Sequence, residues 1–325
     1  MIVYILVFLT SLLISFLITP QVIKLAKKYD IVDKPDSRKI HTENIPRIGG
    51  LSIIISLILS ISFYLSILYI FDPNFLVLKY FKYKFLQIVG LILAFLIIII
   101  VGIIDDIKNL KAIEKLIFQI LIANILYFTG TKIEFFTGLF NSSTIVLNDI
   151  VSYILTIFWI VGIVNAINLI DGLDGLLSGV SFIISITLGI LAIIKGQTVL
   201  AIVIFSLAGA LLGFLRYNFN PAKIFLGDTG SLFIGLFMAV ISILGYFKKA
   251  TLISFFIPLL IFSFPILDTT LAILRRIIRK QSIFKPDKEH LHHILLKAGL
   301  SQKQTVIVFY IITILISILV ISIGI

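Results

Sequence analysis

The sequence contains no cysteine, one tryptophan and two methionines, and only 13% of its 325 residues are charged. The absence of cysteine excludes structural disulfides and thiolate catalysis. The charged fraction is about half of that in soluble domains. Hydrophobic residues make up 60% of the chain and the mean hydropathy is +1.18. This composition excludes a soluble globular fold, because a protein of this size could not bury that much apolar surface, and it also excludes a disordered chain.

Long apolar runs account for most of the chain, and a transmembrane helix needs about 20 apolar residues. We therefore predict an all-α polytopic membrane protein with about ten transmembrane helices, in which residues 1–325 form a single integral membrane domain. Between the fourth and fifth runs, residues 132–149 contain two β-prone stretches around a Gly/Asn/Ser turn, which predicts a small external β-hairpin. The expected spans are 2–23, 49–70, 85–104, 113–128, 150–164, 176–194, 199–215, 231–246, 252–277 and 305–325.

Basic residues determine the expected orientation. Twenty of the 27 lysines and arginines fall on alternate loops, so the positive-inside rule places those loops in the cytoplasm and both termini outside. The net charge of +11 is therefore a topological signal, and no nucleic-acid partner is predicted. Thirteen of the 16 acids and all four histidines share the cytoplasmic face. Acids have no strong topological bias of their own, so their crowding there predicts a cytoplasmic functional site.

Asp105 and Asp106 end the third expected span, and Lys115 opens the fourth. Adjacent carboxylates repel each other, and a divalent cation or a cationic ligand between them relieves the repulsion. Lys115 is placed to face an anion. The alternative is a helix-end pair that only marks the membrane interface.

Polar side chains recur every three residues at Asn165, Asn168, Asp171 and Asp174, in a stretch without lysine or arginine. This spacing lines one side of a helix end and of the loop that follows. Oxygen donors of this kind suit Mg²⁺. An ordinary polar cap and turn is the alternative, but it would need only one Asn or Asp.

The segment 225–231 reads Phe-Leu-Gly-Asp-Thr-Gly-Ser and precedes the eighth expected span. It offers a carboxylate, two hydroxyls and free backbone N–H groups at a helix start, where phosphate binds readily. The alternative is an ordinary N-cap by Asp228 or Ser231. Beside the two preceding motifs, Asp228 is interpreted as a second metal ligand.

His290, His292 and His293 lie in the longest cytoplasmic loop. They lack the matching cluster that a zinc site needs. Because arginines and a lysine lie just upstream at 275–280, an anion pocket is the preferred interpretation, with the basic run itself an orientation signal that contacts lipid headgroups.

A further charged loop carries Arg38, Lys39 and His41, continues through Arg47 and ends in a Gly pair at 49–50. Taken alone it is typical of a solvated membrane interface. In this context its side chains are possible contacts to a substrate phosphate.

These motifs, in this order, resemble those of the MraY/WecA/TagO-like polyprenyl-phosphate N-acetylhexosamine-1-phosphate transferases. The resemblance runs from residue 31 to about residue 296. The segments 32–50, 265–269 and 287–296 resemble the WecA/TagO branch, whereas MraY-type chains usually carry a run of His after Pro-Leu.

The resemblance implies an enzyme of the plasma membrane that transfers N-acetylhexosamine-1-phosphate, GlcNAc first, from a UDP-sugar to undecaprenyl or another polyprenyl phosphate. UMP is released, and lipid-linked cell-envelope glycan synthesis begins. It also implies a Mg²⁺ cofactor, with Mn²⁺ as a substitute, and a possible homodimer. By resemblance the metal ligands are Asn168 and Asp228; the phosphate-binding residues are Lys115, His290, His292 and His293; the nucleotide-sugar contacts are Asn165, Asp171, Asp174 and Phe225; and the residues that position or deprotonate the lipid phosphate are Asp105 and Asp106.

Two points stay open at this stage. A phosphate monoester has a second pKa of about 6, so the acceptor is largely ionised without a general base, and the two aspartates could instead organise charge around Mg²⁺ and Lys115. The alternative functions are MraY-type phospho-MurNAc-pentapeptide transfer, a secondary transporter and a non-catalytic scaffold. A transporter would place its polar groups near the membrane midplane, often with repeat symmetry.

Overall fold

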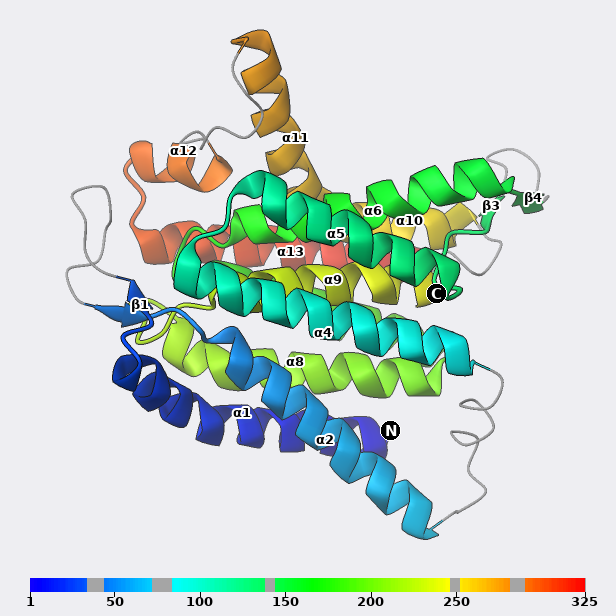
Figure 1. Ribbon diagram of the computed structural model, residues 1–325, viewed down its shortest axis with the longest axis horizontal. Helices are drawn as coiled ribbons and strands as arrows, with labels where there is room; N and C mark the ends of the chain where they lie inside the picture. Colours follow the sequence, from blue (N-terminus) through cyan, green and yellow to red (C-terminus); the bar gives the residue numbers. More distant parts are fainter. Residues whose placement is uncertain (34–43, 72–83, 138–143, 246–251, 281–289, 325) are drawn as a thin grey trace.

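The computed structural model describes residues 1–33, 44–71, 84–137, 144–245, 252–280 and 290–324. It is a bundle of long helices that run roughly side by side (Figure 1). The helices are α1 (Ile2–Lys28), α2 (Gly50–Phe71), α4 (Phe85–Lys108), α5 (Ala112–Phe128), α6 (Asp149–Ile170), α7 (Leu176–Ile194), α8 (Thr198–Asn218), α9 (Gly227–Gly245), α10 (Leu252–Ile261), α11 (Ser263–Ile278), α12 (Leu291–Lys297) and α13 (Gln302–Gly324).

The expected all-helical membrane fold is confirmed. Among the described residues, eight helices are long and apolar enough to cross a membrane, namely α1, α2, α4, α6, α7, α8, α9 and α13. The other two expected spans are present in a different form. Helix α5 has 17 residues, which is about 25 Å and shorter than the hydrocarbon core of about 30 Å. The run 252–277 is divided between α10 and α11.

The division between α10 and α11 has a local cause. Pro265 has no backbone N–H and so cannot donate to the carbonyl of Ile261, the last residue of α10. Helix α11 leaves the bundle at this point and projects away from it (Figure 1). The sequence contained this signal, and the expectation of one uninterrupted span was wrong at this proline.

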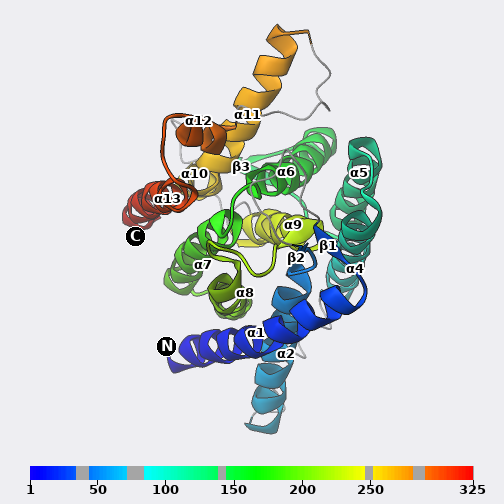
Figure 2. The ribbon, with the colours of Figure 1, turned by 90° about the vertical axis from the view of Figure 1, so that its left-hand side faces the viewer.

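Helix α9 forms the centre of the bundle. In the view along the helices it is surrounded by α2, α4, α6, α7 and α8, and it packs against each of them (Figure 2). Of the residues in the 18-residue apolar stretch of α9, 83% are buried inside the protein. The corresponding fractions are 22% for α1 and 28% for α13, which lie at the periphery. The N-terminus of α9 is therefore a point on which several helix ends converge.

Two short antiparallel hairpins cover the ends of the bundle. The predicted one pairs β3 (Phe135–Thr137) with β4 (Thr144–Val146), in the register Phe136↔Ile145. A second, which the sequence did not predict, pairs β1 (Val32–Asp33) with β2 (Ile45–Pro46). The β3–β4 hairpin and both chain termini lie at one end, whereas β1, the start of α5 and α12 lie at the other (Figure 1). This second end holds the polar site.

Candidate active site

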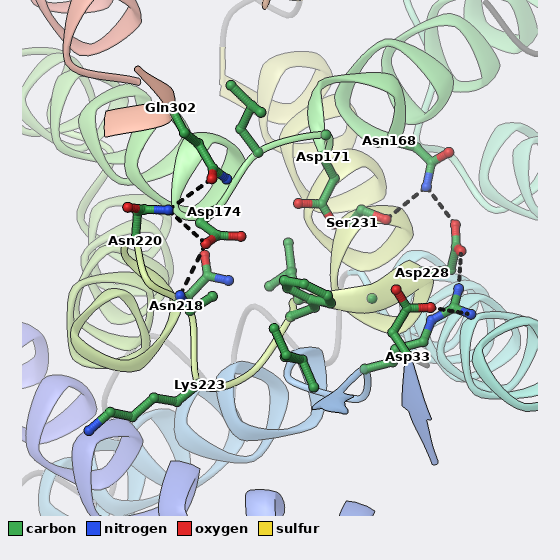
Figure 3. Close-up of a pocket in the computed structure, with 18 of the residues that line it drawn as sticks. Asp33, Asn168, Asp171, Asp174, Asn218, Asn220, Lys223, Asp228, Ser231 and Gln302 are labelled. Carbon is green, nitrogen blue, oxygen red and sulfur yellow. Dashed lines mark hydrogen bonds and ion pairs between the residues drawn. The ribbon is translucent and has the colours of Figure 1, made fainter. Parts of the chain in front are cut away.

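A cavity of about 990 Å³ opens at the end of the bundle that carries β1 and β2. Its walls come from the β1–β2 segment, the start of α5, the loop between α6 and α7, the loop between α8 and α9, and the first turns of α9 and α13. Figure 3 shows carboxylate and amide side chains from these elements directed toward one space. Segments that are far apart in the sequence thus contribute to one polar cavity.

The end of α6 meets the start of α9 through Asn168. Its Nδ2 donates to Asp228 Oδ1 at 2.7 Å and to Ser231 Oγ at 2.7 Å (Figure 3). Rotation of the amide by 180° would place its oxygen beside the Asp228 carboxylate instead. The two residues predicted to share a metal ion are therefore direct neighbours in the cavity wall.

Lys115 supplies a cation to the same corner. Its Nζ lies 2.7 Å from Asp105 Oδ2 and 3.4 Å from Asp228 Oδ1. The other Asp105 oxygen accepts the backbone N–H of Leu110 at 2.6 Å. Asp105 is therefore nearly enclosed, with 4% of its side chain exposed, and it holds Lys115 beside Asp228.

Asp106 holds the beginning of α9. Its carboxylate accepts the backbone N–H groups of Asp228 at 2.8 Å and Thr229 at 3.0 Å, and the Thr229 hydroxyl at 2.6 Å. Gly227, just before, has a φ of +72°, and a Cβ there would collide with the carbonyl of Arg47. The Gly-Asp-Thr sequence thus fits between Asp106 and the β2 segment, with Asp228 directed at the cavity.

The loop between α6 and α7 carries two further carboxylates. Asp174 Oδ2 accepts the amide of Asn220 and the backbone N–H of Ala222, both at 3.0 Å. Burial raises the pKa of Asp171 to about 8, and the carboxylates of Asp228, Asp106 and Asp174 add to the rise. A cation bound among these side chains would relieve the repulsion and favour the ionised form of Asp171.

The histidine segment packs onto this loop from α12. His290 Nδ1 lies 2.8 Å from Asp268 Oδ2 on α11, which fixes the start of α12. His292 lies against Gly172, where a Cβ would come within 2.7 Å of its Nε2. Burial, with the neighbouring histidines, lowers the pKa of His292 to about 4. His293 alone of the three lines the cavity.

The predicted site residues therefore separate into groups. The cavity is lined by Lys115, Asn168, Asp171, Asp174, Phe225, Asp228 and His293, and the residues that support it from behind are Asp105, Asp106, His290 and His292. Asn165 lies one helical turn away, where its Nδ2 donates to Gln119 Oε1 at 2.6 Å, and it is not part of the cavity wall. Arg38, Lys39 and His41 lie outside the described residues.

Three residues at or next to the cavity were not predicted from the sequence, namely Asn220, Gln302 and Tyr310. Asn220 Nδ2 also donates to Gln302 Oε1 at 2.8 Å, and Gln302 belongs to the first turn of α13. Tyr310, further along α13, donates to the carbonyl of Gly175 at 2.5 Å. Asn220 precedes a proline at the end of an apolar run, which is a usable loop signal. Gln302 and Tyr310 belong to no motif.

The donor set of the cavity suits a hard cation. Carboxylate, amide and hydroxyl oxygens come from Asp171, Asp228, Asn168 and Ser231, and the chain has no sulfur ligand from cysteine. Within the described part of the chain, no group of three or more His, Asp or Glu side chains could hold a metal ion by itself. A metal bound here would therefore need substrate oxygens or water as additional ligands, which is typical of Mg²⁺.

Comparison with known proteins gives a consistent result. A family model described as glycosyl transferase family 4 matches residues 88–246. The chain is 41% identical over 311 residues to a probable undecaprenyl-phosphate N-acetylglucosaminyl 1-phosphate transferase of Bacillus subtilis (strain 168), a match that covers 96% of this chain and 82% of that protein. It is 35% identical to the decaprenyl-phosphate N-acetylglucosaminephosphotransferase of Mycobacterium leprae, in a match that covers 94% of this chain and 80% of that protein. It is 29% identical to the undecaprenyl-phosphate alpha-N-acetylglucosaminyl 1-phosphate transferase of Escherichia coli (strain K12), in a match that covers 86% of this chain and 73% of that protein.

Proposed function

The chain belongs to glycosyl transferase family 4, and we propose that it transfers N-acetylglucosamine-1-phosphate from UDP-N-acetylglucosamine to a polyprenyl phosphate, which starts a lipid-linked glycan. The observation that carries this proposal is the contact between Asn168, Asp228 and Lys115 in one cavity at an end of a membrane helix bundle. A water-soluble diphosphate can enter such a cavity while the polyprenyl chain of the acceptor stays in the bilayer.

In the transfer, an oxygen of the lipid phosphate attacks the β-phosphorus of the UDP-sugar. The bond from that phosphorus to the bridging oxygen breaks, and UMP leaves with the electron pair. Asp228 and Asn168 would hold Mg²⁺ together with oxygens of the diphosphate, and the metal would supply charge neutralisation for the leaving group. Lys115 Nζ, 3.4 Å from Asp228 Oδ1, would neutralise a phosphate oxygen on the same side.

We assign positioning roles to Asp105 and Asp106. Every oxygen of these two carboxylates already accepts a hydrogen bond from the protein. The acceptor phosphate is largely a dianion at pH 7, because its second pKa is about 6, so it needs no proton acceptor. Asp105 holds Lys115, and Asp106 holds the loop that presents Asp228.

We further propose that the cavity faces the cytoplasm and that both termini lie on the other side of the membrane. The excess of basic residues on alternate loops supports this orientation, and the termini lie at the end of the bundle away from the cavity (Figure 1). The sequence contains no cysteine, so a cysteine placed at position 223 or 149 is the only thiol that a reagent can label. Lys223 lies at the cavity end of the bundle and Asp149 at the other end. A membrane-impermeant thiol reagent added outside intact cells should label Asp149→Cys and not Lys223→Cys.

The proposed transfer is tested with purified protein, UDP-N-acetylglucosamine and polyprenyl phosphate, with either Mg²⁺ or EDTA. Lipid-linked product and UMP should form only with Mg²⁺. UDP-MurNAc-pentapeptide in place of the donor should give no product, which separates this function from the MraY-type alternative. Uptake of substrate into protein-containing vesicles without lipid-linked product would instead support a transporter. Whether the chain forms the homodimer that the resemblance implies is checked by the mass of the detergent-solubilised protein.

A further inference from the structure

Arg47 enters the cavity from the strand β2 side. Its backbone position is fixed because Pro46 accepts the N–H of Phe225 at 2.8 Å and the N–H of Gly49 donates to the carbonyl of Phe225 at 3.0 Å. The β2 segment is thus hydrogen-bonded to the loop that leads into α9. One quarter of the Arg47 side chain is exposed, and it lines the cavity beside Asp228.

The guanidinium of Arg47 is surrounded by carboxylates but makes no close ion pair with them. It lies 3.7 Å from Asp33, 4.0 Å from Asp106 and 3.9 Å from Asp228, and its one hydrogen bond among the described residues is to the amide oxygen of Asn109 at 3.2 Å. A charge-assisted hydrogen bond is about 2.7–2.9 Å long. Lys115 reaches that distance with Asp105, at 2.7 Å. Arg47 is held in the cavity by the surrounding negative charge while most of its five N–H donors remain available.

The described cavity wall also carries two lysine side chains, Lys115 and Lys223. Lys115 is paired with Asp105, and the side chain of Lys223 points away from the centre of the cavity (Figure 3). Four aspartates, in contrast, line the wall. Besides Lys115 and the Mg²⁺ of the proposed function, Arg47 is the cation of the described wall that faces this negative charge, and its planar fork matches two oxygens of a phosphate.

We propose that Arg47 binds a phosphate group of a substrate during transfer, an inference that rests on the proposed function. The ligand chemistry is a phosphate with two free oxygens, which both the lipid monophosphate and the diphosphate of the nucleotide sugar present. The fork of Arg47 turns from its distant carboxylate neighbours to this phosphate and forms two charge-assisted hydrogen bonds. The same contact keeps the substrate beside Asp228.

The test compares Arg47→Gln and Arg47→Lys with wild type and with Arg216→Gln, an exposed arginine at the end of α8 that does not line the cavity. Each substrate is varied while the other is saturating. Arg47→Gln should lower kcat/KM about 10- to 100-fold, the range for loss of hydrogen bonds to a charged group. Arg47→Lys should recover part of the loss, because lysine keeps the charge but not the fork. Arg216→Gln should match wild type.

The substrate whose KM rises identifies the phosphate: the lipid if the acceptor KM changes, the nucleotide sugar if the donor KM changes. The Mg²⁺ concentration that gives half-maximal rate should stay unchanged in Arg47→Gln. If that concentration shifts while both KM values are unaffected, Arg47 acts only by positioning Asp228, and the proposal is wrong. Unaltered kinetics in Arg47→Gln would overturn it as well.

A binding measurement separates this proposal from the proposed function. Thermal unfolding is followed with inorganic phosphate and with inorganic diphosphate, both in the presence of Mg²⁺. Wild type and Arg216→Gln should be stabilised by at least one of them, and Arg47→Gln should lose that stabilisation. Equal stabilisation of all three proteins, or none of wild type, would refute phosphate binding at Arg47. Wild type that binds these anions but makes no lipid-linked product would contradict the proposed function alone.

Discussion

The amide nitrogen of Asn168 lies 2.7 Å from Oδ1 of Asp228, although the two residues are 60 positions apart in the chain. One ends α6 and the other begins α9, the central helix of the bundle. The contact therefore depends on the packing of α6 against α9, and a metal ion shared by the two residues would tie these helices together at the cavity.

Replacing Asp228 by Ala should lower Mg²⁺-dependent transfer by about 100-fold or more, because loss of a residue that only supports a metal ligand already costs about 10- to 100-fold and loss of a ligand should cost more. Transfer rates across a Mg²⁺ titration measure the effect. Asp149→Asn changes an exposed carboxylate at the start of α6, at the opposite end of that helix, and should leave the titration unaltered. Undiminished Mg²⁺ stimulation in Asp228→Ala would show that the metal binds elsewhere.

Gly227→Ala should abolish transfer. Its φ of +72° costs an L-residue about 1–2 kcal/mol, and the new Cβ would also displace the Arg47 carbonyl and the Asp106 carboxylate. Gly130→Ala is the matched control, because its φ is +95° but no atom lies within 4 Å of the added Cβ. Thermal unfolding should show a small loss of stability in Gly130→Ala, from backbone strain alone, and a larger loss in Gly227→Ala, which adds the collision. Activity should be lost in Gly227→Ala only. Equal activity of the two would contradict the close fit at Gly227.

Tyr310→Phe should raise the KM for the UDP-sugar about 3- to 10-fold, the change expected when one hydrogen bond is lost. The KM for polyprenyl phosphate should stay unchanged. The hydroxyl holds the Gly175 carbonyl, at the end of the loop that carries Asp171 and Asp174. Tyr153→Phe removes a comparable bond, to Asn124 Oδ1 at 2.8 Å, and should not alter either KM. A purely structural role of Tyr310 would instead lower the unfolding temperature without the shift in donor KM.

His292 should make the protein less stable as the pH falls from about 6.5 to about 4. Its pKa is about 4 in the folded protein, lowered from 6.5, so the unfolded chain binds more protons in this window and unfolding is favoured there. Above pH 6.5 the histidine is neutral in both states and contributes no slope. Thermal unfolding in detergent at stepped pH should show a shallower dependence in His292→Gln. Identical pH slopes in the two proteins would mean that His292 titrates normally.

Much of the fold could be predicted from the chain because the length of an apolar run and the β-propensity of a short segment are local properties. The runs 2–23 and 176–194 correspond closely to α1 and α7, and the β-prone pair became β3 and β4. The three-residue spacing predicted that Asn168, Asp171 and Asp174 share one side, and all three line the cavity, although Asp171 and Asp174 lie beyond the end of α6. The same spacing predicted that Asn165 would share this side. Its side chain, one turn earlier in α6, is hydrogen-bonded to Gln119 instead and does not line the cavity.

Only the tertiary structure decided which polar groups meet. Asp105 and Asp106 are adjacent in the sequence, yet one pairs with Lys115 and the other caps the start of α9, because successive residues of a helix point in different directions. Arg47 lies in a charged loop for which the sequence predicts only a general contact to a substrate phosphate, and Tyr310 lies in an apolar run. They reach the site because β2 is hydrogen-bonded to the loop before α9 and because α13 packs against α7. The spacing of residues in the sequence relates only side chains that are a few positions apart. The distances within the cavity join residues far apart in the chain, and they depend on how the whole bundle packs around α9.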